Sequence, residues 1–432
     1  MFGLARGRWE MKAGTATRGD IEAVQLEKLH LGMEEVLTNN LFYRRRHHSV
    51  NTWSDFYSLP FLTKVELVED QNTNPPFGTN LSYPLGKYVK LHQTSGSSGG
   101  KPLRWLDTRK SWSWWTHIWT DHVYKAARVR NGDRIFFAFS FGPFIGFWSA
   151  FAGAQRLGAM AIPGGAMSTE QRVLAIRDLD PTVLCCTPSY ALRLAQAGKE
   201  LGVDLSNCAI RMTVHAGEPG ASIPSTKHAI EEAYGARCFD HTGMTELGPT
   251  GFGCPLGDGV HLIESEFIFE VIPLGSDEDM PVSRPEGTGE LVASNLGRFC
   301  SPLIRYRTGD LVELSRDPCA CGSPFVKAVG GIRGRVDDMF TVRGINLYPS
   351  QIEEVLRRYS EIVNFQIRHE KVRHMDEVSL LIETKTGSDD VVERVVLDMR
   401  HSFGVRINCW CVAHGTLPSN ELKASRVVHV ES

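Results

Sequence analysis

A glycine- and serine-rich loop is the clearest chemical signal in this sequence. Residues 94–102 read Thr-Ser-Gly-Ser-Ser-Gly-Gly-Lys-Pro, and they follow a strand-like run, KYVKLHQ, at 87–93. Small residues let backbone N–H groups turn inward around an anion, hydroxyl groups add further donors, and Lys101 adds positive charge. The loop therefore predicts a phosphate-binding site.

Three other interpretations of this loop fit its residues less well. A Walker A loop requires Gly at position 95 and Ser or Thr at position 102, where this chain has Ser95 and Pro102. The G-x-S-x-G pattern at 96–100 would make Ser98 a hydrolase nucleophile, but that turn leads directly into a helix, and residues 101–105 predict extended chain. The preceding strand and the Lys-Pro ending argue against a flexible surface linker.

The elements after this loop alternate between short apolar runs and amphipathic helical patterns. Thr187 before Pro188 is a good helix start, because a capping hydroxyl precedes proline at the first helical position. Strands that alternate with helices predict parallel β-α units with both faces of the sheet covered. The apolar runs lie at 135–140, 159–165, 182–187, 210–217 and 236–243.

The pattern changes twice more along the chain. After Gly259, strand-like runs separated by Pro- and Gly-rich turns predict an antiparallel β region up to about residue 335. After Gly334, a capping box that begins at Ser350 opens one helix, and 390–403 predicts a second helix, in a βαββαβ order. We therefore expect a large α/β N-terminal domain (1–335) with parallel sheet layers and an antiparallel β subdomain (about 259–335). A small α+β C-terminal domain (336–432) follows it.

Composition and charge exclude several classes of protein. The chain has 432 residues, and its 47 Lys+Arg and 50 Asp+Glu give a formal net charge of -3. This balance offers no electrostatic argument for a nucleic-acid or membrane-surface partner. Ten Cys are too few for a disulfide scaffold, and the N-terminus lacks the apolar run of a signal peptide. We expect a cytoplasmic, multi-domain enzyme with no nucleic-acid or membrane partner.

One uncharged segment, residues 135–154, is long enough to span a bilayer. Gly142-Pro143 interrupts it near its middle, and its first part is Phe-rich in the manner of a strand. A strand, a turn and a buried helix fit this pattern better than a membrane span.

Five motifs in order resemble those of adenylate-forming acyl-CoA synthetases, and together they cover nearly the whole chain. The 94–102 loop is similar to the phosphate-binding loop of that superfamily. The other four are His215-Ala216-Gly217-Glu218-Pro219, Thr242-Gly243-Met244-Thr245-Glu246, Tyr306-Arg307-Thr308-Gly309-Asp310-Leu311, and Gly334-Arg335-Val336-Asp337-Asp338-Met339 with the loop at 343–349. The resemblance is closest to phenylacetate–CoA ligases, on LEKL…FYRR (26–45), LPFLTK (59–64) and TVLCCTPSYALRL (182–194).

The resemblance implies an ATP-dependent, AMP-forming carboxylate–CoA ligase. Acid and ATP give an acyl-adenylate and pyrophosphate, and the CoA thiol then displaces AMP. ATP, Mg²⁺ and CoA are the implied cofactors, and a small carboxylic acid is the substrate. Two alternatives stay open: an adenylating enzyme that passes its acyl group to a carrier protein or an amine, and a catalytically inactive nucleotide-binding relative. Retention of Glu246, Asp310 and Lys423 argues against the inactive relative. A homodimer also stays open.

The resemblance assigns a role to each motif. Asp310 would accept hydrogen bonds from the ribose hydroxyls, Glu246 would bind Mg²⁺ beside the catalytic Thr245, and Arg335 would contact ribose or phosphate. Thr242 stands where the family usually has an aromatic residue that packs on the adenine. Without that stacking, nucleotide binding would be weaker by about 1–2 kcal/mol. The neighbouring His241 is a candidate to compensate for this loss. The implied nucleotide-binding residues are Thr94, Ser95, Gly96, Ser97, Ser98, Gly99, Lys101, Gly217, Glu218, Pro219, Asp240, His241, Thr242, Asp310, Arg335 and Arg343.

The family also uses a lysine near the C-terminus that moves in to bridge the carboxylate and the α-phosphate. Lys423 in LPSNELKASR (417–426) is the candidate, although Leu422 replaces the usual glycine before it. The resemblance implies that the C-terminal domain is mobile and rotates between the two steps about a hinge at Asp337.

The acid is predicted to lie among apolar side chains. By resemblance its pocket is formed around 139–147, 216–218 and 242–244, which favours an aromatic or compact apolar acid over a charged one. The same aromatic residues could instead be core, and Trp112, Trp114, Trp115 and Trp119 are interpreted as packing. The predicted substrate-contacting residues are Phe141, Gly142, Phe147, Ala216, Gly243 and Met244.

A C-x-C pattern, Cys319-Ala320-Cys321, is typical of a metal-binding turn. The resemblance implies Cys254 and His261 as upstream partners, which completes a Cys₃His set suited to structural zinc. Because C-x-C alone is a weak signal and His261 is 58 residues away (319 minus 261), four ordinary residues stay the alternative.

Overall fold

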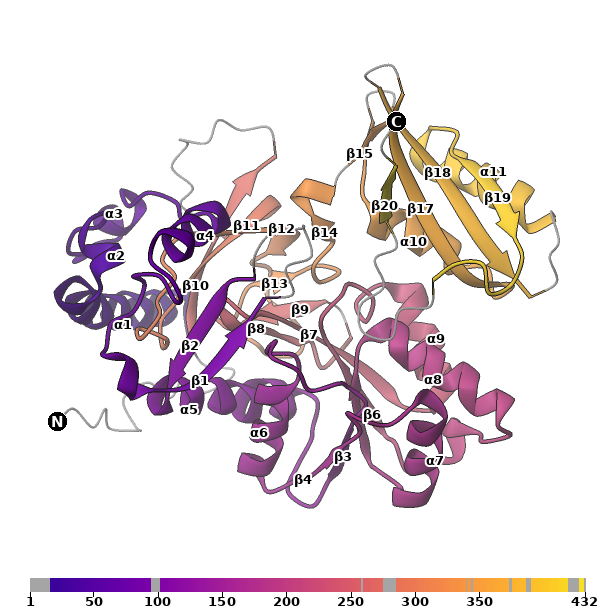
Figure 1. Cartoon of the computed structure of the whole chain (residues 1–432), viewed down its shortest axis with the longest axis horizontal. Coiled ribbons are helices and arrows are strands. Elements are labelled where there is room, and N and C mark those ends of the chain that lie inside the picture. The colour runs from indigo at the N-terminus through magenta and orange to yellow at the C-terminus, as the bar shows by residue number, and fades with distance from the viewer. Residues whose placement is uncertain are drawn as a thin grey trace.

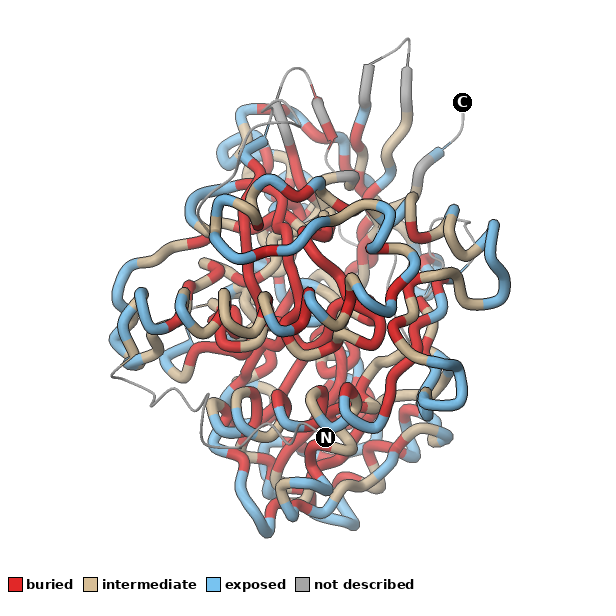
Figure 2. The backbone as a smooth tube through the Cα atoms, turned by 90° about the vertical axis from the view of Figure 1, so that its left-hand side faces the viewer, coloured by how far each residue is buried: buried red, intermediate tan, exposed pale blue. Residues whose placement is uncertain are grey.

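The computed structural model describes residues 16–94, 102–257, 259–274, 285–338, 340–342, 345–372, 375–385, 390–418 and 427–430. Within these residues, one long mixed sheet runs through the large N-terminal part, and a four-stranded sheet organises the C-terminal part (Figure 1). Buried backbone is concentrated in the strands, whereas exposed segments lie mainly on the outer helices and loops (Figure 2).

The predicted parallel β-α units form one half of the long sheet. Five strands pair in parallel in the order β4-β3-β5-β6-β7. Both faces of this half are buried: Phe137 packs into one core and Phe136, its neighbour, into the other. The strands are β3 (Arg134–Phe137), β4 (Met160–Pro163), β5 (Val183–Cys186), β6 (Met212–His215) and β7 (Arg237–Met244). The connecting helices are α6 (Trp148–Leu157), α7 (Thr169–Leu179), α8 (Pro188–Glu200) and α9 (Pro224–Tyr234).

The predicted helix start at Thr187 is confirmed, since Thr187 is the N-cap of α8 and Pro188 is its first residue. The uncharged 135–154 segment forms β3, a turn region and most of α6. Among the described residues, no helix is long and apolar enough to cross a membrane.

Antiparallel strands form the other half of the sheet, and they begin earlier than predicted. β8 pairs with β7 from Gly248 onward. It was not predicted because a glycine-rich strand carries little sequence signal, although its backbone can still form the hydrogen bonds of a sheet. The first strand-like stretch after Gly259, at 261–272, forms two strands rather than one, separated by a turn at Glu264–Glu266. The strands are β8 (Gly248–Gly253), β9 (Val260–Leu262), β10 (Phe267–Pro273), β11 (Gly287–Asn295), β12 (Tyr306–Ser315), β13 (Lys327–Ala328) and β14 (Gly334–Arg335).

The N-terminal elements lie beside the antiparallel half (Figure 1). Gln25 on α1 donates hydrogen bonds from Nε2 to the carbonyls of Glu264 and Phe267, which fixes that helix to the turn before β10. The helices are α1 (Arg18–Asn39), α2 (Leu41–Arg44), α3 (Trp53–Tyr57), α4 (Lys64–Thr73), α5 (Arg109–Ile118) and the π-helical η2 (Trp119–Tyr124). A separate two-stranded sheet, β1 (Tyr88–Gln93) with β2 (Arg104–Thr108), precedes α5. Short 3₁₀ turns are η1 (Leu85–Lys87) and η3 (Leu205–Asn207).

The C-terminal part has its own apolar core, drawn from residues between Phe340 and Val427. Its four-stranded sheet has the order β19-β18-β17-β20, in which β17 and β18 are antiparallel. The helix predicted at 390–403 is confirmed as α11 (Asp390–Phe403). The other elements are η4 (Val336–Asp338), β15 (Phe340–Val342), β16 (Ile345–Leu347), α10 (Pro349–Leu356), β17 (Ile362–Val372), β18 (Met375–Thr384), β19 (Asn408–Val412) and β20 (Val427–Val430).

The capping box predicted to begin at Ser350 starts two residues earlier. Tyr348 is the N-cap of α10 and Pro349 its first residue, and the Gln351 side chain accepts the Tyr348 backbone N–H at 3.0 Å. Proline at the first helical position, with its fixed φ, sets this start.

Candidate active site

The predicted phosphate loop connects β1 to β2. Thr94 closes its base: the Thr94 backbone N–H donates to the Leu103 carbonyl at 2.9 Å, and Thr94 Oγ1 accepts the Leu103 N–H at 3.0 Å. The Gln93 N–H donates to the Pro143 carbonyl at 2.8 Å, which joins this base to the turn after β3. The predicted loop residues Ser95, Gly96, Ser97, Ser98, Gly99 and Lys101 lie outside the described residues.

The loops after β3, β5, β6 and β7 meet at one edge of the sheet, because parallel strands end on the same side. After β6, Gly217 has a φ of 96°, a conformation that favours glycine. Glu218 Oε1 accepts the Ser189 backbone N–H at 2.8 Å and so caps the first turn of α8. The predicted segment Ala216–Pro219 is thus held against the start of the neighbouring helix.

Asp240 lies in β7 where its parallel pairing with β6 ends, and it is close to Gly331. Its Oδ2 accepts the Ser222 hydroxyl at 2.5 Å, and a Cβ added to Gly331 would lie 3.0 Å from that oxygen. Burial raises the pKa of Asp240 to about 6, although the hydrogen bond from Ser222 opposes this shift. Gly331 is only four residues before Arg335, so these contacts bring two predicted nucleotide-binding motifs together.

Thr242 and His241 occupy a bulged part of the β7–β8 ladder. The register shifts between Thr242 and Gly243, and Thr250 Oγ1 donates to Thr242 Oγ1 at 3.1 Å. The His241 ring lies against Trp119, with ring centroids 4.2 Å apart, and Nδ1 of His241 lies 2.7 Å from the Gly251 carbonyl. Bulges next to active sites re-aim side chains in this way.

Glu246 lies in a turn after β7, and the buried Arg298 holds the backbone of this turn by hydrogen bonds. Arg298 Nη1 donates to the carbonyls of Thr245 and Glu246 at 2.7 and 2.8 Å, while Asp107 pairs with the same guanidinium at 2.9 and 2.7 Å. The Glu246 carboxylate lies 3.6 Å from the half-exposed Lys64 Nζ. A carboxylate held on a fixed turn is a suitable ligand for Mg²⁺, which prefers hard oxygen donors.

Asp310 and Arg335 face each other across the β12–β14 pairing. Arg335 Nη1 donates to Asp310 Oδ1 at 3.2 Å and to the Thr308 carbonyl at 2.6 Å. Gly309, between Thr308 and Asp310, has a φ of 72°, a backbone conformation that favours glycine. The charges of Glu246, Asp310 and Arg335 all act on the buried Tyr306 hydroxyl, whose pKa burial raises. The structure therefore brings the three motifs into one region.

An aromatic wall follows β3 beside the same edge. Phe139 contacts Phe144 and Phe147 with ring centroids 5.6 and 5.1 Å apart, and Phe141 contacts Trp148 at 4.7 Å. Phe147 is buried, but Phe139, Phe141 and Phe144 are only half-buried. Of the other predicted acid-contacting residues, Gly142 lies in this wall, Ala216 and Met244 pack against the same core, and Gly243 is exposed at the end of β7.

Two predicted residues and the hinge belong to the C-terminal part. Asp337 lies in the 3₁₀ turn η4, directly after β14 and before the C-terminal core. Lys423 and Arg343 lie outside the described residues.

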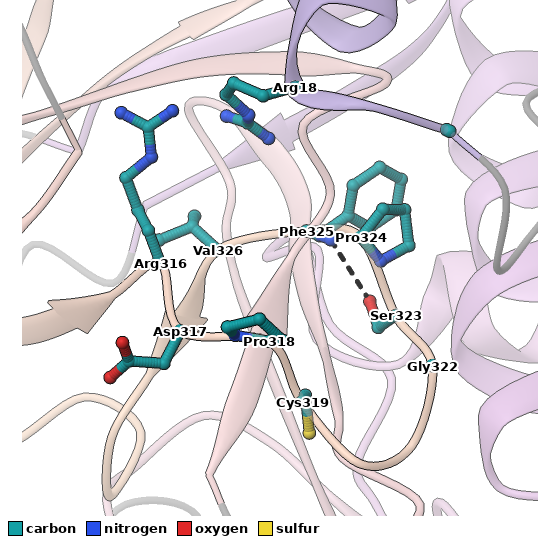
Figure 3. A pocket seen from close by; sticks show the side chains of 11 residues that line it. Arg18, Arg316, Asp317, Pro318, Cys319, Gly322, Ser323, Pro324, Phe325 and Val326 are labelled. Carbon is teal, nitrogen blue, oxygen red and sulfur yellow. Dashed lines mark hydrogen bonds between the residues drawn. The ribbon is translucent and has the colours of Figure 1, made fainter.

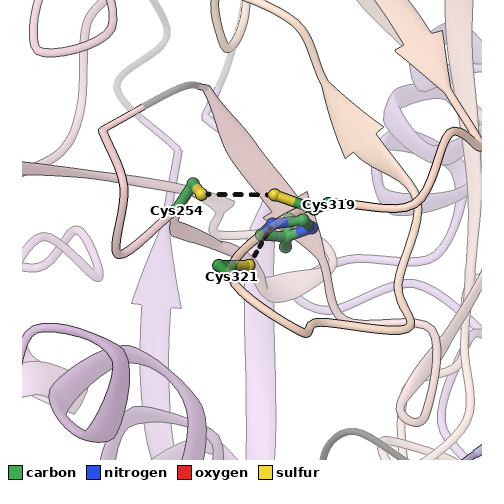
Figure 4. A group of neighbouring side chains, drawn as sticks. Cys254, Cys319 and Cys321 are labelled. Carbon is green, nitrogen blue, oxygen red and sulfur yellow. Dashed lines mark hydrogen bonds between the residues drawn. The ribbon is translucent and has the colours of Figure 1, made fainter.

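The four predicted zinc ligands do come together (Figure 4). Their ligand atoms lie within 4.8 Å of one another, with Cys254 Sγ 3.7 Å from Cys319 Sγ and Cys321 Sγ 3.2 Å from His261 Nε2. Tetrahedral zinc with Zn–S bonds of about 2.3 Å requires sulfur atoms about 3.8 Å apart. His261 Nδ1 lies 3.1 Å from the Phe325 carbonyl, so Nδ1 carries the hydrogen and Nε2 is the metal-facing atom. The residues therefore fit a closed zinc site.

A cavity of about 340 Å³ is lined by Cys319 of this cluster and lies between the start of α1 and the Cys319 loop (Figure 3). At its margin the Arg18 guanidinium pairs with Glu264 at 2.5 and 2.7 Å, and Glu264 also accepts the Val326 N–H at 2.7 Å. Among the described residues, none of those predicted to bind nucleotide or acid lines it.

Sequence reasoning missed two residues that support the site. The interpretation of Trp119 as packing is confirmed, since it is a buried core residue, and its ring also contacts His241. Arg298 and Asp107 carried no motif, because an isolated charged residue in a sequence gives no sign of its burial. Nothing in the sequence pairs residues that lie 191 positions apart.

Comparisons with known proteins identify the family of this chain. Residues 344–430 match the AMP-binding enzyme C-terminal domain. Phenylacetate–coenzyme A ligase of Escherichia coli (strain K12) is 30% identical over 432 residues, which cover 96% of this chain and 95% of that protein.

Among solved structures, 2-hydroxyisobutyryl-CoA ligase in its postadenylation state is 28% identical, with a TM-score of 0.88 over 97% of this chain and 91% of the other. The same ligase in its thioesterification state, 29% identical, gives a TM-score of 0.70 at the same coverage. The predicted resemblance is thereby confirmed. This chain belongs to the phenylacetate–coenzyme A ligase family of AMP-forming acid–thiol ligases.

Proposed function

We propose that this enzyme activates an aromatic or compact apolar carboxylic acid with ATP and transfers the acyl group to CoA. The observation that supports this proposal is that aromatic side chains and polar, nucleotide-type groups lie together at one edge of the sheet. The half-buried phenylalanines after β3 offer apolar walls for the acid, and the polar groups at the ends of β6, β7 and β12 suit a nucleotide.

The nucleotide roles follow from the chemistry of each group. Asp310 would accept hydrogen bonds from ribose hydroxyls, and its pairing with Arg335 fixes the carboxylate for that task. Asp240 and the Gly217–Pro219 segment would surround the adenine, where the buried Asp240 is an acceptor for an exocyclic amine. The loop that Thr94 closes would hold the β- and γ-phosphates.

Glu246 would hold Mg²⁺, which when bound neutralises phosphate charge. Arg298 donates a hydrogen bond to the backbone carbonyl of this glutamate. The turn is therefore fixed, and the carboxylate could bind the metal ion without a rearrangement of the backbone. Lys64, 3.6 Å away, balances the carboxylate charge and would have to yield to the metal ion.

We further propose that residues 336–432 form a mobile domain that turns about Asp337 and carries Lys423 to the α-phosphate. The separate C-terminal apolar core supports a unit that can move as one body. The TM-score of this chain is 0.88 against one state of a related ligase and 0.70 against another state of the same ligase, at equal coverage. Because the ligase is the same, the difference reflects how its parts are arranged in the two states and not a difference in fold. The higher score supports an arrangement like that of the postadenylation state for this chain.

The proposal is tested by pyrophosphate release from ATP across a panel of aromatic and short aliphatic acids, with and without CoA. We expect acid-dependent pyrophosphate release and, when CoA is present, an acyl-CoA thioester. Pyrophosphate release without a thioester, together with acyl transfer when an amine or a carrier protein is added, would show that this compound and not CoA is the acceptor. No acid-dependent release from any member of the panel would contradict the proposal.

A second proposal concerns the Cys254, His261, Cys319 and Cys321 cluster. We propose that it binds one structural zinc ion, since three thiolates and one imidazole select zinc over hard cations. Such a site would join β8 and β9 to the loop before β13 and has no part in the reaction.

A further inference from the structure

His241 lies on the face of β7 that the aromatic wall covers. Side chains alternate between the two faces of a strand, and Phe239, two residues earlier, packs into the same core as Trp119 and Phe147. The His241 ring accordingly contacts Trp119.

The neighbours of His241 on β7 point to the opposite face. Cys238 packs into the core beneath α8 and α9, and Asp240 and Thr242 continue that alternation. A nucleotide beside Asp240 and Thr242 could not stack on the imidazole, so His241 does not compensate for the aromatic residue missing at Thr242. Its position suits contact with the acid instead.

The hydrogen bond of Nδ1 determines what the other ring nitrogen can do. A carbonyl oxygen only accepts, so Nδ1, 2.7 Å from the Gly251 carbonyl, carries the hydrogen. Burial lowers the pKa of His241 to about 4, which keeps the ring neutral at pH 7. Nε2 is therefore an unprotonated hydrogen-bond acceptor.

Nε2 lies beside the exposed end of β7. A Cβ added to Gly243 would lie 3.3 Å from it, and within the described part of the chain no hydrogen-bond donor contacts it. Other polar groups of the wall bond internally: Trp119 Nε1 donates to Ser149 Oγ at 2.8 Å, and Trp148 Nε1 donates to the Gly142 carbonyl at 3.0 Å. Nε2 of His241 is thus an acceptor without a donor among the described residues, beside otherwise aromatic side chains, and it would favour a ligand that brings a donor to it.

We propose that Nε2 of His241 accepts a hydrogen bond from a hydroxyl or amino group of the acid, so that the enzyme selects acids that carry such a donor. The carboxylate cannot be the partner, because a neutral acceptor offers it no hydrogen. This inference rests on the proposed function and narrows its substrate class to hydroxylated or amino-substituted acids. An acid without the donor would leave a buried acceptor unsatisfied.

The test compares matched acids in wild type, two variants of His241 and one control variant. The pairs are hydroxybenzoates with benzoate, hydroxyphenylacetates with phenylacetate, and 2-hydroxybutyrate with butyrate, and the readout is kcat/KM for pyrophosphate release. We expect at least one donor-bearing acid to exceed its partner by about ten- to one-hundred-fold. His241→Leu should abolish that ratio, His241→Gln should restore part of it, and the exposed-site control His228→Leu should leave it unchanged.

A binding measurement separates this inference from the proposed function. Calorimetric titration with N-acylsulfamoyl adenosine analogues of the same pairs requires no turnover. We expect the donor-bearing analogue to bind at least about ten-fold more tightly to wild type but not to His241→Leu. Equal affinities in wild type, or a preference that survives His241→Leu, would overturn the role of His241 even if acids are activated.

Discussion

Arg298 and Asp107 form a bidentate ion pair that is completely buried, and the same guanidinium holds the backbone of Thr245 and Glu246. The guanidinium also lies over the rings of Trp105 and Trp115, at 5.4 and 5.1 Å from their centroids. The core of the large domain is thus connected directly to the turn that carries the proposed Mg²⁺ ligand.

Arg298→Met should destabilise the protein by about 3–5 kcal/mol, because it leaves the Asp107 carboxylate buried without a partner. Urea unfolding measures the loss. The double variant Arg298→Met/Asp107→Leu should recover part of it, since the unpaired charge is then removed. Equal stability of the single variant and wild type would show that the pair does not support this turn.

Glu246→Gln should lower the rate of acyl-adenylate formation by about 10²–10³-fold while the fold is kept, because a neutral amide is a poor ligand for Mg²⁺. Pyrophosphate release at saturating ATP and several Mg²⁺ concentrations measures this. Glu34→Gln, at an exposed glutamate on α1, is the matched control. A wild-type rate in Glu246→Gln at ordinary Mg²⁺ would refute the assignment.

Lys423→Ala should slow adenylate formation by about two to three orders of magnitude, because the charge that stabilises the α-phosphate in the transition state is lost. A supplied acyl-adenylate should still be converted to the thioester, since the second arrangement moves Lys423 away from the site. Separate half-reaction rates test this. Equal slowing of both steps would contradict alternation of the domain.

Asp337→Pro should have the reverse effect, because proline fixes φ near −65° at the proposed hinge in η4. Adenylate formation should be kept while thioester formation is lost. Asp337→Ala is the control, because it removes the carboxylate without restricting φ, and it should keep both steps. Loss of both steps in Asp337→Pro with an intact fold would argue that this turn has another role.

Purified protein should contain about one zinc ion per chain by elemental analysis. Cys321→Ser should lose the metal and lower the Tm, because three ligands no longer close the site, whereas Cys208→Ser, at a cysteine outside the cluster, should keep both. A metal-free, fully active and equally stable wild-type preparation would remove the zinc proposal.

Much of the secondary structure of this chain, and its family, could be predicted from short stretches of the sequence. The β-α alternation, the Thr187-Pro188 helix start and α11 were predictable because apolar periodicity and capping residues act over a few positions. The five ordered motifs indicated the family, since each has a fixed local spacing. The start of β8 was missed because a glycine-rich strand acquires its structure from its partner β7.

The tertiary structure alone decided how distant residues combine. Only folding brings Cys254 and His261 to the Cys319 turn, pairs Arg298 with Asp107, and places His241 against Trp119. Strand register determines which face of β7 each side chain occupies, and a shift of one residue would exchange His241 with Thr242. The sequence by itself therefore determined most of the elements and the family of this protein. Long-range strand pairing and burial decided which distant residues meet and which face of β7 each side chain occupies, because neither is encoded in any short stretch of residues.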